Sequence, residues 1–304
     1  MSDLEPRRAR TLAEFGANAD KMFRLEEIMA SVGSYRPRPT DVIISPFAKC
    51  GTTWLQQILH CLRTRGDMDF TDISEVVPWI ETAVCLGIDL EAPQRADPRA
   101  FKSHLPFDKM PKGARYIVAL RDPKDALVSF YRFMEGWFFE PGAIGFEEFA
   151  GARLAGSTAD DGYWHHLNSW WAQRDNPDVL LMSYEQMIAD PAARIRRVAE
   201  FCGIPLDAEL LSLTLERSSL AFMLQHKELF DDAMMRRASE LRCNLPPGGD
   251  SAKVRKGGSG GHLLEMPASV AAAVDAKWAE LTAPATGFDS YAALDAELRR
   301  RTAT

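Results

Sequence analysis

The chain has 304 residues, of which 46% are hydrophobic and 26% are charged, as is typical of a soluble globular protein. Its net charge of −7 argues against broad binding to nucleic acid or to an anionic membrane surface, so an anionic ligand would need a local basic pocket. The five cysteines are odd in number and form no C-x-x-C pair, which argues against a disulfide framework or a zinc site and favours reduced thiols.

The N-terminus predicts neither a secretory signal nor a membrane anchor. Residues 1–20 are polar, and we expect them to form a tail ahead of a single domain over residues 21–304. Arg7-Arg8-Ala9-Arg10 is not followed by an apolar run of signal-peptide length, and no apolar stretch is long enough to span a membrane. We therefore expect a cytoplasmic protein.

Short apolar runs alternate with helical patterns along the chain. The runs cover residues 42–44, 100–103, 116–120 and 179–182, and the helical patterns include 53–65, 124–134 and 191–202. Buried strands separated by helices predict a single α/β domain with a central parallel sheet flanked by helices. We expect loops at residues 86–98, 136–161 and 243–261.

A candidate anion-binding turn follows the first apolar run. Lys49-Cys-Gly-Thr-Thr-Trp54 links that run to an amphipathic helix, so a strand delivers a turn to a helix N-terminus. Unpaired N–H groups at a helix start stabilise a phosphate, and a lysine in the turn adds a charge. The Walker loop has its lysine directly after the second glycine, whereas Lys49 precedes Gly51. This order predicts a relative of the nucleotide loop that is adapted to another donor.

Polar residues follow the other predicted strands. Lys102 and His104 come after the second, Arg121 after the third with Ser129 on the next helix, and Tyr184 after the fourth. Ligands of open α/β sheets bind beyond the carboxyl ends of the strands, so we expect these side chains to form one site.

These motifs together resemble the cytosolic sulfotransferase family over roughly residues 38–262. The resemblance rests on the following segments: Lys49-Cys-Gly-Thr-Thr-Trp54, Lys102-Ser-His-Leu-Pro106, Arg121-Asp-Pro-Lys-Asp-Ala-Leu-Val-Ser129, Trp164 to Trp171, Tyr184-Glu185 and Arg255-Lys-Gly-Gly-Ser-Gly260. The family transfers a sulfuryl group from 3′-phosphoadenosine 5′-phosphosulfate (PAPS) to a hydroxyl or amine, leaving adenosine 3′,5′-bisphosphate (PAP). The resemblance therefore implies a P-loop-like fold, PAPS as donor, and no required metal.

The resemblance also implies a role for each matching residue. The implied donor site consists of Lys49, Cys50, Gly51, Thr52, Thr53, Trp54, Arg121, Ser129, Tyr184, Ser218, Arg255, Lys256 and Gly257. Within it, Lys49 to Thr53 would hold the phosphosulfate, Trp54, Tyr184 and Ser218 the adenine, and Arg121, Ser129 and residues 255–257 the 3′-phosphate. His104 would be the base. The candidates for the acceptor pocket are Phe47, Trp79, Phe138, Phe139 and His166.

The residue types suit this chemistry without the family name. A nucleophilic hydroxyl must lose a proton, and a histidine with an ordinary pKa near 6.5 can accept it, which makes His104 a candidate base. As attack proceeds, negative charge builds on the oxygens of the transferred group, and Lys49 and Lys102 would stabilise that charge. Ser129 would also tune the catalytic effect of Lys49. We therefore predict a sulfotransferase that acts on a small, apolar acceptor.

Structural interpretations stay open beside these roles. Lys49 could be a surface lysine, Trp54 a core residue and His104 a structural histidine, and residues 164–171 could form a buried aromatic helix face. Two rival functions also remain: a nucleotide-dependent phosphotransferase, which requires magnesium, and a non-catalytic protein that binds PAP.

The chain departs from the family pattern at three places. Ala48 and Cys50 flank the lysine where the family has proline and serine, and Gly261-His262 replaces Asp-Trp at the end of the basic loop. The first two departures predict altered fine geometry at Lys49, and the third predicts a different closure and stability of the basic loop. A lysine-rich C-terminal dimer motif is not recognisable, so a homodimer is one possibility among several oligomeric states.

Overall fold

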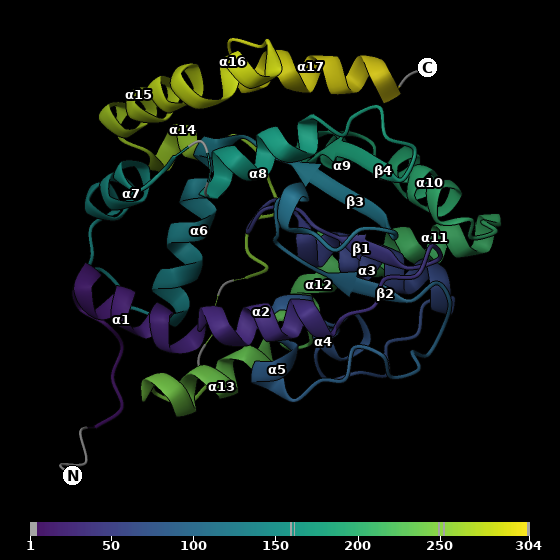
Figure 1. The fold of residues 1–304 in the computed structure, drawn as a ribbon, viewed down its shortest axis with the longest axis horizontal. Helices are drawn as coiled ribbons and strands as arrows, with labels where there is room; N and C mark the ends of the chain where they lie inside the picture. The colour runs from purple at the N-terminus through teal and green to yellow at the C-terminus, as the bar shows by residue number, and fades with distance from the viewer. Residues whose placement is uncertain (1–4, 159, 161, 249, 252, 303–304) are drawn as a thin grey trace.

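The computed structural model describes residues 5–158, 160, 162–248, 250–251 and 253–302. Within them, one parallel sheet lies at the centre of the molecule, with strand order β2-β1-β3-β4 (Figure 1). The strands are β1(Val42–Ile44), β2(Ala100–Lys102), β3(Arg115–Leu120) and β4(Val179–Ser183). Their register pairs Val42 with both Ala100 and Arg115, and Tyr116 with Val179. The predicted parallel sheet and all four predicted strands are confirmed.

Helices surround this sheet on both faces. The α-helices are α1(Leu12–Met22), α2(Leu25–Ser34), α3(Thr52–Thr64), α4(Ile73–Val76), α5(Ala83–Leu86), α6(Pro123–Trp137), α7(Phe146–Ala155), α8(Gly162–Trp171), α9(Tyr184–Ala189), α10(Pro191–Cys202), α11(Ala208–Arg217), α12(Leu220–Gln225), α13(Ala233–Cys243), α14(His262–Glu265), α15(Ala268–Lys277), α16(Ala283–Thr286) and α17(Tyr291–Thr302). Shorter helical turns are η1(Ile80–Thr82), η2(Phe107–Lys109), η3(Lys227–Phe230) and η4(Trp278–Thr282).

Alternate residues of each strand pack into different cores. Ile117 and Ala119 of β3 pack with α3, α10 and α11, whereas Tyr116, Val118 and Leu120 pack with α8, α15 and α17. Successive strand side chains point to opposite faces, so a strand buried on both faces is apolar throughout. The continuous apolar runs of the sequence have this origin, and the sheet is the middle of three layers (Figure 1).

The predicted tail of residues 1–20 is wrong in its second half. Helix α1 begins at Leu12 and crosses the predicted boundary, and Ala9 pairs with the chain after α6, since its N–H donates to the carbonyl of Phe138 at 3.0 Å. Residues 1–20 are polar on average, but Leu12, Phe15 and Met22 have helical spacing and share one face of α1. These side chains pack into an aromatic core with α6, α7 and α13.

The predicted loops are confirmed at two of three places. No described residue of 87–99 belongs to a helix, and none between α13 and α14 does. The expected loop at 136–161 is wrong, because α6 continues to Trp137 and α7 lies inside it. Phe149 of α7 is fully buried in the aromatic core and Ala150 in the core with α8 and α15, and this long-range packing stabilises the helix.

Among the residues that the structure describes, no helix is both long enough and apolar enough to cross a membrane.

Candidate functional site

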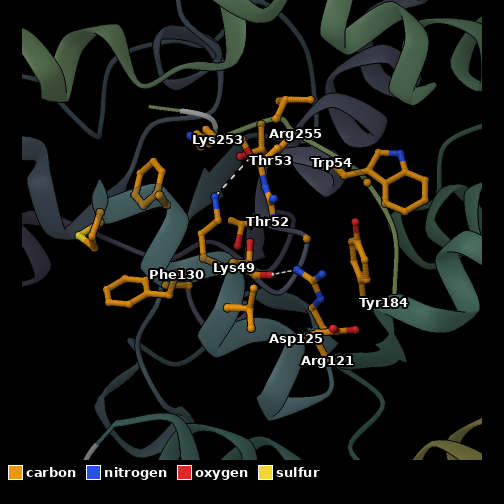
Figure 2. A pocket seen from close by; sticks show the side chains of 18 of the residues that line it. Lys49, Thr52, Thr53, Trp54, Arg121, Asp125, Phe130, Tyr184, Lys253 and Arg255 are labelled. Carbon is orange, nitrogen blue, oxygen red and sulfur yellow. Dashed lines mark hydrogen bonds between the residues drawn. The ribbon is translucent and has the colours of Figure 1, made fainter. Parts of the chain in front are cut away.

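A cavity of about 590 Å³ lies where the turn after β1 meets the ends of β2 and β3. Helices α1 and α6 and the segment that follows α13 complete its walls. Figure 2 shows Trp54 and Tyr184 at one end, Phe130 at the other, and Lys49 between them. The sequence-predicted residues that line the cavity are Lys49, Gly51, Thr52, Thr53, Trp54, Trp79, Lys102, His104, Arg121, Ser129, Phe138, Tyr184, Ser218, Arg255, Lys256 and Gly257.

The turn after β1 presents unpaired donors to this cavity. Gly51 has φ of 96°, and a Cβ added there would lie 2.9 Å from Cδ2 of Tyr184, so only glycine fits. Helix α3 begins at the next residue, and the first N–H groups of a helix have no acceptor within it. The buried hydroxyl of Thr52 also has no hydrogen-bond partner among the described residues. This turn can therefore hold an anion.

Cys50 differs from its neighbours in this turn. Its side chain is buried and does not line the cavity, and its N–H donates to the carbonyl of Phe47 at 3.0 Å. Burial raises the pKa of its thiol to about 12, so the group stays neutral. Cys50 thus does not line the cavity, and its contact with the donor stays a prediction.

Arg121 joins the two sides of the expected donor site. Its Nη1 donates to the carbonyl of Lys49 at 2.7 Å (Figure 2), and its Nη2 donates to that of Gly258 at 3.0 Å. The guanidinium lies 4.3 Å from the centroid of the Tyr184 ring, and its buried Nε has no partner among the described residues. Arg121 thus fixes the turn after β1 to the segment after α13 and keeps one donor free.

The two rings at one end of the cavity form a corner. The Trp54 and Tyr184 rings meet edge to face, with centroids 5.8 Å apart, and the buried Nε1 of Trp54 has no partner in the described chain. Ser218 lies beside them, but its hydroxyl donates to the carbonyl of Thr214 at 2.6 Å. Gly257 has φ of 59°, and a Cβ there would lie 2.7 Å from Cδ2 of Leu220. A flat ring can pack in this corner.

A carboxylate already contacts the basic residues expected at the 3′-phosphate. Glu265 lies 2.9 Å from Nζ of Lys256, 3.4 Å from Nη1 of Arg255 and 3.0 Å from Nε of Arg132. Burial raises the pKa of Glu265, but Lys256 and Arg132 outweigh it and lower the pKa to about 2. Three cations around one carboxylate leave an excess of positive charge beside the cavity.

Asp125 of α6 anchors the loop that carries these cations. Its carboxylate accepts the N–H of Gly260 at 2.6 Å, the N–H of His262 at 3.0 Å and the Nδ1 of His262 at 2.8 Å. Burial raises its pKa, yet the hydrogen bonds from His262 outweigh burial and lower it. His262, a departure from the family pattern, therefore attaches this loop to α6 together with Gly260.

Two lysines lie close to the centre of the cavity. Nζ of Lys49 donates to the carbonyl of Lys253 at 3.3 Å, and Lys102 lies over the Trp79 ring at 4.1 Å. Burial and the charge of Lys253 lower the pKa of Lys49 to about 7. Burial lowers the pKa of Lys102 to about 8, against the opposing effect of Asp232.

His104 is held at both its backbone and its ring. Its N–H donates to Oε1 of Glu81 at 2.6 Å, and its Nδ1 lies 2.7 Å from the carbonyl of Pro46. A carbonyl only accepts, so Nδ1 carries the proton and Nε2 bears the lone pair. Burial and the charge of Lys102 lower the pKa of His104 to about 3, well below the ordinary value that the sequence suggested.

The end of the cavity near His104 is apolar. Its walls contain the following aromatic side chains: Phe15, Phe23, Trp79, Phe130, Phe133, Trp137 and Phe138. Phe15 comes from the N-terminal segment that was expected to be a tail, and Phe23 follows α1 in the same wall. This end suits an apolar ligand, because apolar surface gains most from leaving water.

Three of the five acceptor-pocket candidates do not line the cavity. His166 is buried with Nε2 3.0 Å from the carbonyl of Ser45, and burial lowers its pKa to about 3. Phe139 is fully buried in the aromatic core, and Phe47 packs on the rings of His166 and Tyr163. These residues support the site from behind.

Several cavity residues escaped the sequence analysis. Asp232 and Lys253 line the cavity at the lysines, and Asp125 lines it at the loop anchor. Asp125 stands within the motif that begins at Arg121, so the motif pointed to it without assigning a role. Asp232 precedes a helix as an ordinary cap residue does, and no local pattern distinguishes it from one.

In the part of the chain that the structure describes, no group of three or more histidine, cysteine, aspartate or glutamate residues is placed to hold a metal ion.

Known sequences match most of this chain. A family model described as a sulfotransferase domain matches residues 39–283. Human sulfotransferase 2A1 is 32% identical over 213 residues, which cover 67% of this chain and 74% of that protein. Mouse sulfotransferase 1 family member D1 is 28% identical over 247 residues, which cover 78% of this chain and 81% of that protein.

Solved structures share the fold. Retinol dehydratase, solved with androsterone and the inactive cofactor PAP, has a TM-score of 0.67 at 18% identity and covers 90% of this chain and 94% of its own. Mouse sulfotransferase SULT7A1, solved with PAP, has a TM-score of 0.66 at 18% identity, with 92% and 95% covered.

Proposed function

Because this chain belongs to the sulfotransferase family, and is therefore an enzyme that transfers a sulfuryl group, we propose how its cavity binds the donor and activates the acceptor. PAPS is the donor, and the acceptor is a small apolar compound with a hydroxyl or a neutral amine. His104 is the base, and Lys49 and Lys102 stabilise the charge that develops on the transferred group.

The residues of the cavity fit PAPS. Relatives of the same fold are described with PAP, and the cavity offers donors without partners at Thr52, Trp54 and Arg121. Lys49, Thr52 and Thr53 would hold the phosphosulfate, Trp54 and Tyr184 the adenine, and Ser129 with residues 255–257 the 3′-phosphate. The bound donor supplies an activated sulfuryl group at the centre of the cavity.

The ring contact of His104 carries the proposal for the base. Since Nδ1 donates to the carbonyl of Pro46, Nε2 keeps a lone pair that can accept the acceptor's proton. The low pKa keeps the imidazole neutral through the physiological range, and it also makes the free-enzyme imidazole a weaker proton acceptor than an ordinary histidine. Glu81 fixes the backbone of His104, and Lys102 lies on the same strand end, so base and electrostatic stabiliser are positioned together.

The aromatic end of the cavity supports an apolar acceptor. Trp79 and Phe138 are proposed acceptor contacts, and Phe15 and Phe23 extend the same wall. A cationic amine is disfavoured there, because Lys49 and Lys102 would repel it.

Sulfuryl transfer from radiolabelled PAPS, without added metal, across a panel of phenols, alcohols and amines tests this proposal. We expect transfer by the wild-type enzyme and a loss of about 10²–10⁴ in rate for His104→Ala with PAP binding retained. Lys49→Ala should lose about 10²–10³ in rate and bind PAP more weakly. His226→Ala, outside the cavity, is the control and should behave as wild type.

Undiminished transfer by His104→Ala would remove the base from this scheme. Binding of PAP without turnover of any acceptor would favour a non-catalytic binding protein, and magnesium-dependent phosphoryl transfer from ATP would favour a phosphotransferase.

Location and assembly are further predictions. The five cysteines are free, which supports a reducing, cytoplasmic location. A possible homodimer and the absence of nucleic-acid binding are testable by size-exclusion chromatography with and without added DNA.

A further inference from the structure

An ion pair lies in the cavity that the proposed chemistry does not use. Asp232 is 3% exposed, and its Oδ1 lies 2.5 Å from Nζ of Lys253 and 3.8 Å from Nζ of Lys102. The carbonyl of Lys253 in turn accepts the hydrogen bond from Nζ of Lys49 (Figure 2). One carboxylate thus connects the two proposed sulfuryl-stabilising lysines with a third.

The backbone places this carboxylate at the lysines at a conformational cost. Asp232 has φ of 51° and ψ of 44°, the left-handed region that favours glycine. It stands at the N-cap of α13, where an aspartate normally accepts an N–H of the first turn, but its side chain makes no such bond. The carboxylate is therefore directed away from the helix that it precedes.

A second aspartate performs the missing capping role. Oδ2 of Asp72 accepts the N–H of Met234 at 2.9 Å, while its Oδ1 accepts the N–H of Ser74 at the start of α4. Asp72 thus serves two helix starts, and Asp232 is left for the lysines. If the only task were to stabilise the start of α13, one of the two carboxylates, Asp72 or Asp232, would be enough.

Several lysines lie close together around Asp232, and a carboxylate among them offsets their mutual repulsion. Lys102 and Lys253 pair with Asp232, and Lys49 bonds to the backbone of Lys253. Burial lowers the pKa of Lys49 to about 7 and that of Lys102 to about 8. Asp232 opposes both shifts. Its own carboxyl is ionised, since Lys102 and Lys253 outweigh burial and hold its pKa well below the ordinary value.

Other charged groups also face this cluster and belong to its balance. Arg121 lowers the pKa of Lys49, and Glu81 and Asp72 raise that of Lys102. His104 experiences both Lys102 and Asp232. Asp232 is distinguished from Glu81 and Asp72 by its ion-pair distances, because Glu81 binds the backbone of His104 and Asp72 binds two helix starts.

We propose that Asp232 is a positioning residue for sulfuryl transfer, the counter-charge that holds Lys102 and Lys253 in place and keeps Lys49 and Lys102 as ammonium groups. This inference rests on the proposed function, in which those lysines stabilise the transferred group. Asp232 touches neither donor nor acceptor in this scheme and acts through the lysines.

The test is the pH dependence of kcat/KM for PAPS, which reports ionisations of the free enzyme. A lysine must be protonated to bind the phosphosulfate, so activity falls as pH rises through its pKa. Asp232→Asn should move this alkaline limb to lower pH by about 1 unit or more, as expected when an opposite charge within a few ångströms is lost. Lys253→Met removes a like charge and should move the limb to higher pH.

A matched control is the neighbouring Asp231→Asn. Asp231 pairs with Arg236 and Ser251 and does not line the cavity, so this variant tests for general disturbance of the α13 start and should keep the wild-type limb. An Asp232→Glu variant should return the limb toward its wild-type position. A limb that stays unchanged in both Asp232→Asn and Lys253→Met would overturn the inference.

A binding measurement keeps the two proposals separable. Calorimetry of PAP binding against pH should show the same opposite shifts without any turnover. If the wild type transfers no sulfuryl group but these shifts appear, the proposed function fails, and Asp232 keeps only its role as counter-charge of the lysines at the PAP site. If transfer occurs and the shifts are absent, the role of Asp232 fails. If Asp232→Asn does not fold, the direction of the Lys253→Met shift decides.

Discussion

At the scale of single residues, the site depends on side chains whose chemistry is set by what surrounds them. His104 is an ordinary histidine in the sequence, but Pro46 fixes its tautomer and burial removes its charge. Lys49 and Lys102 have lowered pKa values for the same reason of burial, and Asp232 opposes it. Identical residues on an open surface would not share these properties.

Gly51→Ala tests the conformation of the turn after β1. The new Cβ would meet Tyr184 at 2.9 Å at a φ of 96°, so we expect a loss of about 1–3 kcal/mol in the free energy of unfolding and weaker PAP binding. Chemical denaturation and calorimetry measure the two effects.

Two other glycines serve as controls that separate the effect of backbone strain from the effect of the clash with Tyr184. Gly113 has φ of 102° with nothing within 4 Å of an added Cβ, so Gly113→Ala should be destabilised by strain alone and bind PAP normally. Gly33→Ala within α2 has neither problem and should be neutral or stabilising. Normal PAP binding by Gly51→Ala would contradict the role given to this turn.

At the scale of elements, the donor site is assembled from a helix start and a loop that another helix holds. Helix α3 presents its N-terminus, and α6 uses Asp125 to hold the loop between α13 and α14 at the hydrogen-bonding groups of Gly260 and His262. Arg121 closes the gap between the two parts through backbone carbonyls of Lys49 and Gly258. The basic residues of the loop are thereby positioned by contacts outside their own motif.

Asp125→Asn should release this loop. Because the pKa of Asp125 is lowered in the fold, its ionised form stabilises the protein above the ordinary aspartate pKa, and this contribution is lost as pH falls through the folded value. We expect a loss of about 1–3 kcal/mol near neutral pH and weaker PAP binding, with the stability difference from wild type shrinking in acid.

Denaturation of Asp125→Asn and wild type at several pH values measures that difference. Asp108→Asn is the control, since Asp108 accepts from His165 on the outside of the cavity and should leave PAP affinity unchanged. A stability difference that grew in acid would contradict the stated sign.

At the scale of the whole molecule, the cavity lies between parts of the chain that are far apart in sequence. Helix α1, the strand ends and the segment after α13 all contribute to it, and the net charge of −7 is compensated locally by a cluster of lysines and arginines. A ligand that bridges these parts should therefore stabilise the whole fold.

PAP at about 100 times its dissociation constant should raise the free energy of unfolding by about 2.7 kcal/mol. Thermal denaturation followed by fluorescence measures this as an increase of several degrees in Tm. The increase should require no magnesium and should diminish in Lys49→Ala. A larger increase with ATP and magnesium than with PAP would contradict the assignment of the donor.

The sequence by itself determined the strands, the turn after β1 and the motifs of the family, because these depend on local alternation, backbone conformation and residue order. The sequence could not determine that α1 forms a wall, that Phe47, Phe139 and His166 stand behind the cavity, or that α7 is a helix. Those outcomes depend on burial by distant segments.

Tertiary structure alone decided the electrostatics of the site. Asp232 meets Lys102 and Lys253 only after three segments fold together, and Asp72, from a fourth, frees it from capping α13. Coulomb interactions follow distance in space and the burial of each group, and neither quantity is written in the local sequence.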